Sequence, residues 1–204
     1  MNRLIPAAAL ALAAAAAVAA PPPMSSSNPR LVQAGRYAVE PSHTRVQFTV
    51  SHMGLTDWYG DFTHVSGSLL LDPARTQAAR VDISIPTGSV STTNATLDGE
   101  LKGADWFDAA RYPAIRFVSS RVVRTAPNKA MIAGALTLHG VTRPVTLSAT
   151  FNGGGVNPLS KAYTVGFNAT TTIRRSDFGV RKYLPMIGDE TAIRISAAFE
   201  RKAP

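Results

Sequence analysis

Apolar and polar residues alternate most regularly in residues 132–151. Every second position is apolar or small in 132–138 and again in 145–151, with threonine or serine between the later ones. Because successive side chains of a β-strand point to opposite faces, this pattern predicts a hairpin with one apolar and one hydroxyl-rich face. His139 and Gly140 supply the turn. A lone hairpin is marginally stable in water, so its apolar face needs a partner.

The same alternation predicts further strands on both sides of this hairpin. Apolar positions share one strand face in the stretches 45–52, 81–85, 115–117, 165–173 and 193–199. A further strand is expected over 62–71, where three consecutive leucines leave its inward face ambiguous. Together these make about eight short strands with short connections, which is typical of a closed antiparallel barrel or a β-sandwich. The interior of an eight-stranded barrel is either filled by side chains or holds one small ligand. Composition alone does not choose between these two interiors.

Two neighbouring regions depart from strand alternation. Leu97 and Leu101 are four residues apart, as on one face of a helix, and two nearby glycines limit that helix to one or two turns. The stretch 53–60 is expected to be a loop. It carries Trp58 and Tyr59, which are expected either to pack on the barrel rim or to form a lid or mouth.

The first 34 residues are expected to lie outside the folded domain. Residues 1–20 combine an early arginine, an Ala/Leu run and small residues before a proline triplet, which predicts a cleavable signal peptide; a membrane anchor is the alternative. Residues 21–34 are rich in proline, serine and asparagine and are expected to form a flexible leader. Residues 35–202 then form one domain. Because the chain has no cysteine, this exported domain must be stabilised by its core.

The chain is basic, with 21 Lys and Arg against 13 Asp and Glu and a net charge of +8. A positive exported protein is expected to associate with anionic lipid surfaces. Nucleic acid is the other usual partner of such charge, but the export signal and the lack of an aromatic-basic motif argue against it. The basic residues in 174–182 are equally compatible with a solvated rim that contains one Arg–Asp pair.

No residue pattern indicates a metal site or an enzyme. The four histidines show no close spacing on one strand face and there is no cysteine to join them, so no bound metal is expected. Asp105 and Asp108 are close in sequence, but beside two aromatic residues they are more typical of turn and capping carboxylates than of an acid–base pair. The sequence has no nucleophile elbow, phosphate loop or dinucleotide fingerprint. Hydrolytic or transfer activity at the two aspartates is therefore the least favoured alternative.

Six segments, in order along the chain, resemble the YceI-like polyisoprenoid-binding family. The likeness covers Tyr37 to Glu200. The segments are VQFTVSHMG, GDFTHVSG, SVSTTNATLDGEL, DWFDAARYPAIRFVSS, GALTLHGVTRPVTL and TTIRRSDFGV. Each segment is short and turn-like, so the specificity of the resemblance comes from all six occurring in the right order.

The resemblance implies an all-β fold, an extended eight-stranded antiparallel lipocalin-like β-barrel with one short helical segment. It also implies export to the periplasm and a long apolar cavity that holds an isoprenoid, an isoprenoid quinone or a fatty amide, without covalent attachment and with no other cofactor. A membrane surface or a membrane cytochrome is an expected partner, and a homodimer is also considered. The alternative is a solid-cored structural or interaction module at the membrane surface, without a bound lipid.

Inward-facing apolar positions, together with one histidine at the end of such a face, form the expected lining of this cavity. The predicted lining comprises Phe48, Val50, His52, Ile83, Ile85, Leu97, Leu101, Phe107, Phe117, Leu136, Leu138, Phe167, Ile173 and Ile195. The expected contacts with a lipid head group or at the mouth are Trp58, Arg174, Arg175 and Asp177. His52 is the residue that could meet the polar end of a ligand, although such a histidine is more often satisfied by a neighbouring residue.

One departure from the family pattern lies in the segment LDGEL. Relatives commonly carry arginine and histidine at the positions that Leu97 and Glu100 occupy here. If those basic groups orient a ligand head group in relatives, that contact is lost in this chain. A phosphate-binding role is therefore not transferred to this helix.

Overall fold

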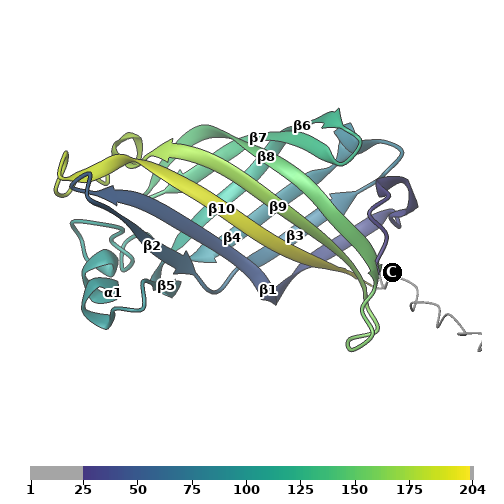
Figure 1. Ribbon diagram of the computed structural model, residues 1–204, viewed down its shortest axis with the longest axis horizontal. Coiled ribbons are helices and arrows are strands. Elements are labelled where there is room, and N and C mark those ends of the chain that lie inside the picture. Colours follow the sequence, from purple (N-terminus) through teal and green to yellow (C-terminus); the bar gives the residue numbers. More distant parts are fainter. Residues whose placement is uncertain (1–24, 203–204) are drawn as a thin grey trace, which may run out of the picture.

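The computed structural model describes residues 25–202, which form an antiparallel β-barrel with one α-helix at one end (Figure 1). The predicted signal peptide lies outside the described residues. The elements are β1 (Gly35–His52), β2 (Thr56–Phe62), β3 (Ser66–Leu71), β4 (Arg80–Pro86), β5 (Val90–Ser91), α1 (Ala95–Lys102), β6 (Ala114–Ala126), β7 (Lys129–Leu138), β8 (Val141–Val156), β9 (Tyr163–Arg174) and β10 (Ile187–Arg201). Short 3-10 helices occupy Pro29–Leu31, Thr76–Ala78, Thr87–Ser89 and Arg175–Phe178.

Eight strands form the barrel wall in the order β1-β3-β4-β6-β7-β8-β9-β10, and β10 pairs with β1 to close it. The long strand β1 has two partners on its other edge: residues 35–38 pair with β3, and residues 46–52 pair with β2. β2 also pairs with the short strand β5. Closure leaves no free edge between β10 and β1 and confirms the predicted eight-stranded barrel.

The hairpin predicted in residues 132–151 is present as β7 and β8. His139 and Gly140 have positive φ values of 50° and 73°, which are the backbone conformations that a tight two-residue turn between antiparallel strands requires. The predicted short helix is present as α1. Asn94 caps it, because its side-chain oxygen accepts hydrogen bonds from the backbone N–H groups of Thr96 (3.1 Å) and Leu97 (3.2 Å).

The region around Trp58 differs from the sequence prediction. Trp58 and Tyr59 were expected in a loop over 53–60, but both lie on β2 and pair with β1. Side chains of β2 do alternate between the two faces of the barrel wall. Gly60 occupies one of the inward positions, opposite an inward residue of β1, so the sequence has no apolar side chain there to reveal the alternation. The single strand expected over 62–71 is also divided in the structure. Its first residue is the last residue of β2, and β3 begins only at Ser66.

One end of the barrel, which we call the closed end, is filled by apolar side chains. The cluster comprises Val32, Tyr37, Leu69, Phe151, Val165 and Phe199. Tyr37 and Val165 have no exposed surface, and the Tyr37 hydroxyl donates a hydrogen bond to the backbone carbonyl of Gln33. Burial, with a smaller contribution from Tyr163, raises the pKa of Tyr37 to about 12. The closed end is therefore a dry, packed core.

The described part of the expected leader lies against this closed end. The backbone N–H of Ser26 donates to the carbonyl of Gly154 (2.9 Å), and the Gly154 N–H donates back to Ser26 (3.0 Å). Val32 is buried in the cluster at 7% exposure. Where the sequence suggested a flexible leader, residues 25–34 are attached to the barrel by a β-bridge, by the buried Val32 and by side-chain hydrogen bonds such as the one from Tyr37 to Gln33.

Candidate functional site

The barrel encloses a cavity of about 600 Å³. This volume lies within the roughly 300–1,000 Å³ that is typical of small-molecule sites. Its walls are almost entirely hydrocarbon, and they extend from Phe167 and Phe199 beside the closed end to α1 at the other end. The apolar faces of the strands thus do not meet in the middle, so the barrel is hollow rather than solid-cored.

Every residue of the predicted lining, from Phe48 to Ile195, borders this cavity. That these residues bind a ligand stays a prediction. Sequence reasoning missed other parts of the wall, including Ile132, Val145 and Leu147 on the central hairpin. Those three lie on the apolar face that alternation identified, so the parity of the hairpin was the signal that could have found them.

Two glycines make room for aromatic rings along the wall. A Cβ atom on Gly60 would lie 2.2 Å from the ring of Phe48, and a Cβ on Gly134 would lie 2.5 Å from the ring of Phe117. Gly60 faces Phe48 directly in the register of β1 and β2. The rings therefore lie over bare backbone of a neighbouring strand, which leaves them close to the wall and the space beyond them open.

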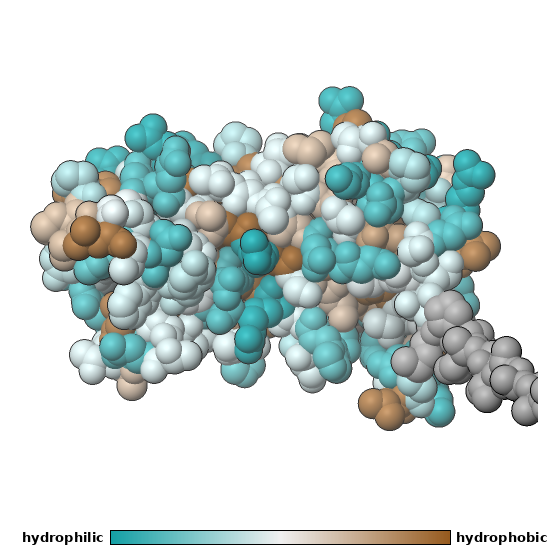
Figure 2. All heavy atoms as spheres, in the orientation of Figure 1, coloured by the Kyte–Doolittle hydropathy of each residue, from teal (hydrophilic) through white to brown (hydrophobic). Residues whose placement is uncertain are grey.

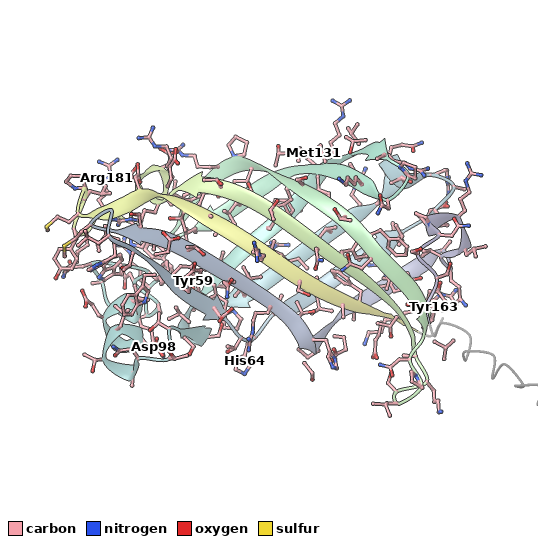
Figure 3. The ribbon with its side chains drawn as sticks, viewed as in Figure 1. Tyr59, His64, Asp98, Met131, Tyr163 and Arg181 are labelled. Atoms are coloured by element: carbon pink, nitrogen blue, oxygen red, sulfur yellow. The ribbon has the colours of Figure 1, made fainter. Side chains whose placement is uncertain are left out.

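The cavity opens at the α1 end, which we call the mouth. The lining residues of the described chain that are exposed all lie there: Trp58, Asn94, Thr96, Glu100 and Tyr183. α1 is held in place partly by Asp98, whose carboxylate accepts hydrogen bonds from the backbone N–H (2.6 Å) and the hydroxyl (2.7 Å) of Thr92. The hydrogen bond from the Thr92 hydroxyl is the main cause that lowers the pKa of Asp98. Figure 3 shows Asp98 on the helix at this end and Tyr163 at the opposite end.

Trp106 and Arg175 form the inner part of the mouth. The indole N–H of Trp106 donates to Glu100 (3.0 Å), and the Arg175 guanidinium lies 5.3 Å from the centre of the Trp106 ring. Arg175 is only 6% exposed and donates four hydrogen bonds to the backbone carbonyls of Val180 (3.1 Å), Lys182 (2.9 Å), Ile187 (2.8 Å) and Gly188 (2.8 Å). Burial lowers the pKa of Arg175, and nearby Asp189 only partly opposes this.

A contact between two distant loops spans the mouth. The Lys182 ammonium lies 2.6 Å from the Asp105 carboxylate, and the rings of Tyr183 and Trp106 are 6.0 Å apart in an edge-to-face arrangement. We call these two contacts the clasp. They join the loop before β10 to the loop after α1.

An exposed apolar surface lies at the same end of the barrel. Met53, Leu55 and Met186, which we call the apolar tip, are 56%, 80% and 54% exposed. The backbone N–H of Met53 donates to the carbonyl of Met186 (2.7 Å), so the β1–β2 turn and the loop before β10 are adjacent. Figure 2 shows brown, hydrophobic side chains at the left end of an otherwise mixed surface, and Figure 3 shows Arg181 near that end.

The expected head-group contacts are divided by the structure. Trp58 and Arg175 line the cavity, whereas Arg174 and Asp177 do not. Arg174 is exposed and pairs with Asp189 (3.1 Å), because residues on one strand alternate and Arg174 follows the inward-facing Ile173. Asp177 is exposed on the turn after β9.

His52 borders the cavity, and its ring centre lies 6.3 Å from that of Trp58. Within residues 25–202, no group of three or more His, Asp or Glu side chains is arranged to hold a metal ion. No helix of that part of the chain has the length and apolar character needed to cross a membrane.

Comparison with known proteins agrees with this architecture. The YceI-like domain matches residues 37–199. A UPF0312 protein of Pseudomonas savastanoi pv. phaseolicola is 38% identical over 142 residues, which cover 70% of this chain and 73% of the relative. A UPF0312 protein of Pseudomonas putida (strain W619) is 39% identical over 142 residues and covers the same shares.

Solved structures show the same fold. BcnA of Burkholderia cenocepacia is 27% identical, with a TM-score of 0.72 over 78% of this chain and 98% of BcnA. A domain of Saccharophagus degradans, described as polyisoprenoid-binding, is 15% identical, with a TM-score of 0.62 over 81% of this chain and 98% of that domain. The second likeness shows the fold alone. With the match of the family over most of the barrel, the chain belongs to the YceI-like domain family.

Proposed function

We propose that this protein is a periplasmic binding protein that holds one long apolar lipid inside the barrel, for transport, storage or stress protection. The observation that carries the proposal is the hydrocarbon-walled cavity of about 600 Å³ with one polar mouth. The polyisoprenoid-binding description of the Saccharophagus domain, which has the same fold, supports an isoprenoid or an isoprenoid quinone as ligand; a fatty amide suits the same walls.

The energetics favour such a ligand. Burial of a methylene group contributes about 0.8 kcal/mol, so a chain of roughly ten buried carbons supplies several kcal/mol beyond the cost of ordering it. The apolar tail would lie toward the closed end and the polar end at the mouth, because the charged side chains of the described lining, Glu100 and Arg175, lie at the mouth. Binding is the proposed activity rather than catalysis, since Asp105 is engaged by Lys182.

The apolar tip gives the proposal a route for exchange. Met53, Leu55 and Met186 lie at the end where the cavity opens, so they would enter a bilayer when the mouth faces it. A membrane is therefore the proposed donor or acceptor of the lipid. A membrane cytochrome as recipient and a homodimer stay predictions from the sequence.

The test is direct recovery and blocking of the ligand. Protein purified from the periplasm is extracted with organic solvent and analysed by mass spectrometry, and uptake of the fluorescent polyene alcohol retinol is titrated. Ala197→Trp places an indole in the cavity from β10, whereas Ala192→Trp adds the same group on the outer face of that strand. We expect one lipid per protein and saturable retinol uptake in the wild type and in Ala192→Trp, and neither in Ala197→Trp.

Two outcomes would count against the proposal. Absence of a stoichiometric lipid together with no saturable retinol uptake by the wild type would favour the alternative, a solid-cored module without a bound lipid. Equal uptake by Ala197→Trp and Ala192→Trp, with both variants folded by circular dichroism, would show that retinol binds outside the barrel. Recovery of the protein only from the cytoplasm would contradict the proposed location.

A further inference from the structure

The mouth of the cavity presents an exposed acidic side chain, although the chain is basic. Among the described residues that line the cavity, Glu100 and Arg175 are the two that carry a full charge at neutral pH. The segment 94–108, which contains α1 and the loop after it, has four carboxylates, Asp98, Glu100, Asp105 and Asp108, and a single basic residue, Lys102. The rest of the chain supplies the excess of positive charge that makes the net charge +8.

Arg175, the cationic residue of the described lining, and Lys182 of the clasp are already engaged. Arg175 directs four of its five N–H groups to backbone carbonyls and is packed against Trp106, so its charge is solvated by the protein itself. Lys182 holds Asp105, whose hydrogen bond is the largest cause that raises the pKa of Lys182, and Glu100 acts in the same direction. A phosphate group would have to break one of these arrangements to pair with Arg175 or Lys182.

The remaining polar groups of the mouth suit an uncharged ligand. Asn94 and Thr96 present a carboxamide and a hydroxyl at exposed positions of the lining. The hydrogen bond from Trp106 uses Oε1 of Glu100, which leaves Oε2 to accept a hydrogen bond from a hydroxyl or amide of the ligand. A negatively charged head group would instead meet the Glu100 carboxylate, and like charges at short range in a partly desolvated site repel strongly.

We propose that the mouth selects lipids with an uncharged, hydrogen-bonding head group, such as an alcohol, an amide or a quinone, and rejects the phosphorylated forms of the same chains. The inference rests on the proposed lipid-binding function and specifies the chemical class of its ligand. Glu100 is the residue that determines this specificity. It does so by its charge, because the carboxylate faces the position that the head group takes when the apolar tail fills the barrel.

The experiment compares two ligands that share one hydrocarbon chain. Geranylgeraniol and geranylgeranyl diphosphate compete with retinol, an uncharged reporter, for the wild-type protein at low ionic strength. We expect the alcohol to displace retinol at a concentration at least about tenfold lower than the diphosphate, and we expect the gap to shrink as salt is added. Glu100→Gln should narrow the gap, and Glu100→Lys should narrow it further or reverse it.

Glu190→Lys is the matched control, because it makes the same charge change on the exposed outer face of β10. It should leave the ratio of the two ligands close to that of the wild type. Retinol uptake with equal or tighter binding of the diphosphate by the wild type overturns the inference and leaves the lipid-binding function intact. An unchanged ratio in Glu100→Lys also overturns it. Failure of retinol itself to bind overturns the proposed function and the inference with it.

Discussion

At the closed end of the barrel, side chains pack against each other; at the mouth, they are tied together by polar contacts around an opening. Tyr37 and Val165 at the closed end are fully buried, whereas Trp58 and Tyr183 at the mouth are 38% and 47% exposed. The same eight strands run through both ends, so the barrel itself does not cause the difference. It comes from what each end adds: the 25–34 segment at one, and α1 with the clasp at the other.

The contrast between the closed end and the mouth indicates that different residues contribute to the stability of the fold and to ligand binding. Apolar burial is the dominant stabilising term in a folded domain. The closed end supplies one packed cluster, and a second buried cluster that includes Leu101, Trp106 and Phe178 lies on the side of α1. The wall around the cavity can therefore leave space for a ligand. Substitutions at the two ends should accordingly have different consequences.

The largest expected effect is on stability at the closed end. Phe151→Ala removes a ring that is 8% exposed and packs 5.4 Å from the ring of Phe167, and it should lower the free energy of unfolding by about 3–5 kcal/mol. Leu136→Ala should cost only roughly 1–2 kcal/mol, because Leu136 borders a cavity that already exists. Urea unfolding of both variants measures the two values. A larger loss in Leu136→Ala would contradict the contrast between a filled closed end and a wall that already borders a cavity.

A smaller effect is expected where a glycine makes room for a ring. Gly60→Ala places a Cβ 2.2 Å from Phe48, so the ring must shift into the lumen, which should cost about 1–3 kcal/mol and weaken retinol uptake. Gly99→Ala is the control, since a Cβ there meets no atom within 4 Å and alanine favours the helix by about 0.5–1 kcal/mol. Unchanged retinol titration in a folded Gly60→Ala protein would show that the ring does not determine the width of the cavity.

The smallest effect concerns the outer surfaces of the two ends. Leu55→Asp removes an apolar side chain from the tip beside the mouth, whereas Leu159→Asp makes the same change at a position that is 91% exposed on the β8–β9 turn, at the closed end. We expect Leu55→Asp to weaken partition onto anionic vesicles by about 1 kcal/mol, or roughly fivefold, and Leu159→Asp to have little effect. Sedimentation with vesicles measures both. Equal losses would indicate that the protein has no preferred orientation on a membrane.

Strand parity predicted most of the barrel because inward and outward positions differ so consistently in polarity. The central hairpin and the helix followed directly from the apolar spacing, and so did the wall of the cavity. Strand parity did not predict the strand that contains Trp58, because Gly60 hides the alternation of β2. Parity also could not predict whether the inward side chains of opposite strands meet at the centre of the barrel.

The polar contacts of the mouth could not be predicted from local pattern, although Trp58 and Arg175 were correctly expected to border the cavity. Lys182 and Asp105 are 77 residues apart, and each is unremarkable in its own turn. Arg174 and Arg175 are adjacent in a basic run, yet one is exposed and the other buried under backbone carbonyls. Alternation continued from the inward-facing Ile173 places Arg174 outward and Arg175 inward, so this difference could have been predicted from the sequence.

The ion pair between Lys182 and Asp105, one of the two contacts of the clasp, has a consequence for the rates at which a ligand enters and leaves. The two side chains of this ion pair are not part of the cavity wall that a hydrocarbon tail would contact. If this ion pair closes the mouth to the same extent in the empty and the ligand-bound protein, it slows association and dissociation by the same factor. The dissociation constant of the ligand is then unchanged. The residence time of the ligand would then depend on a salt-sensitive ion pair, while the affinity for that ligand depends on the lumen behind the mouth.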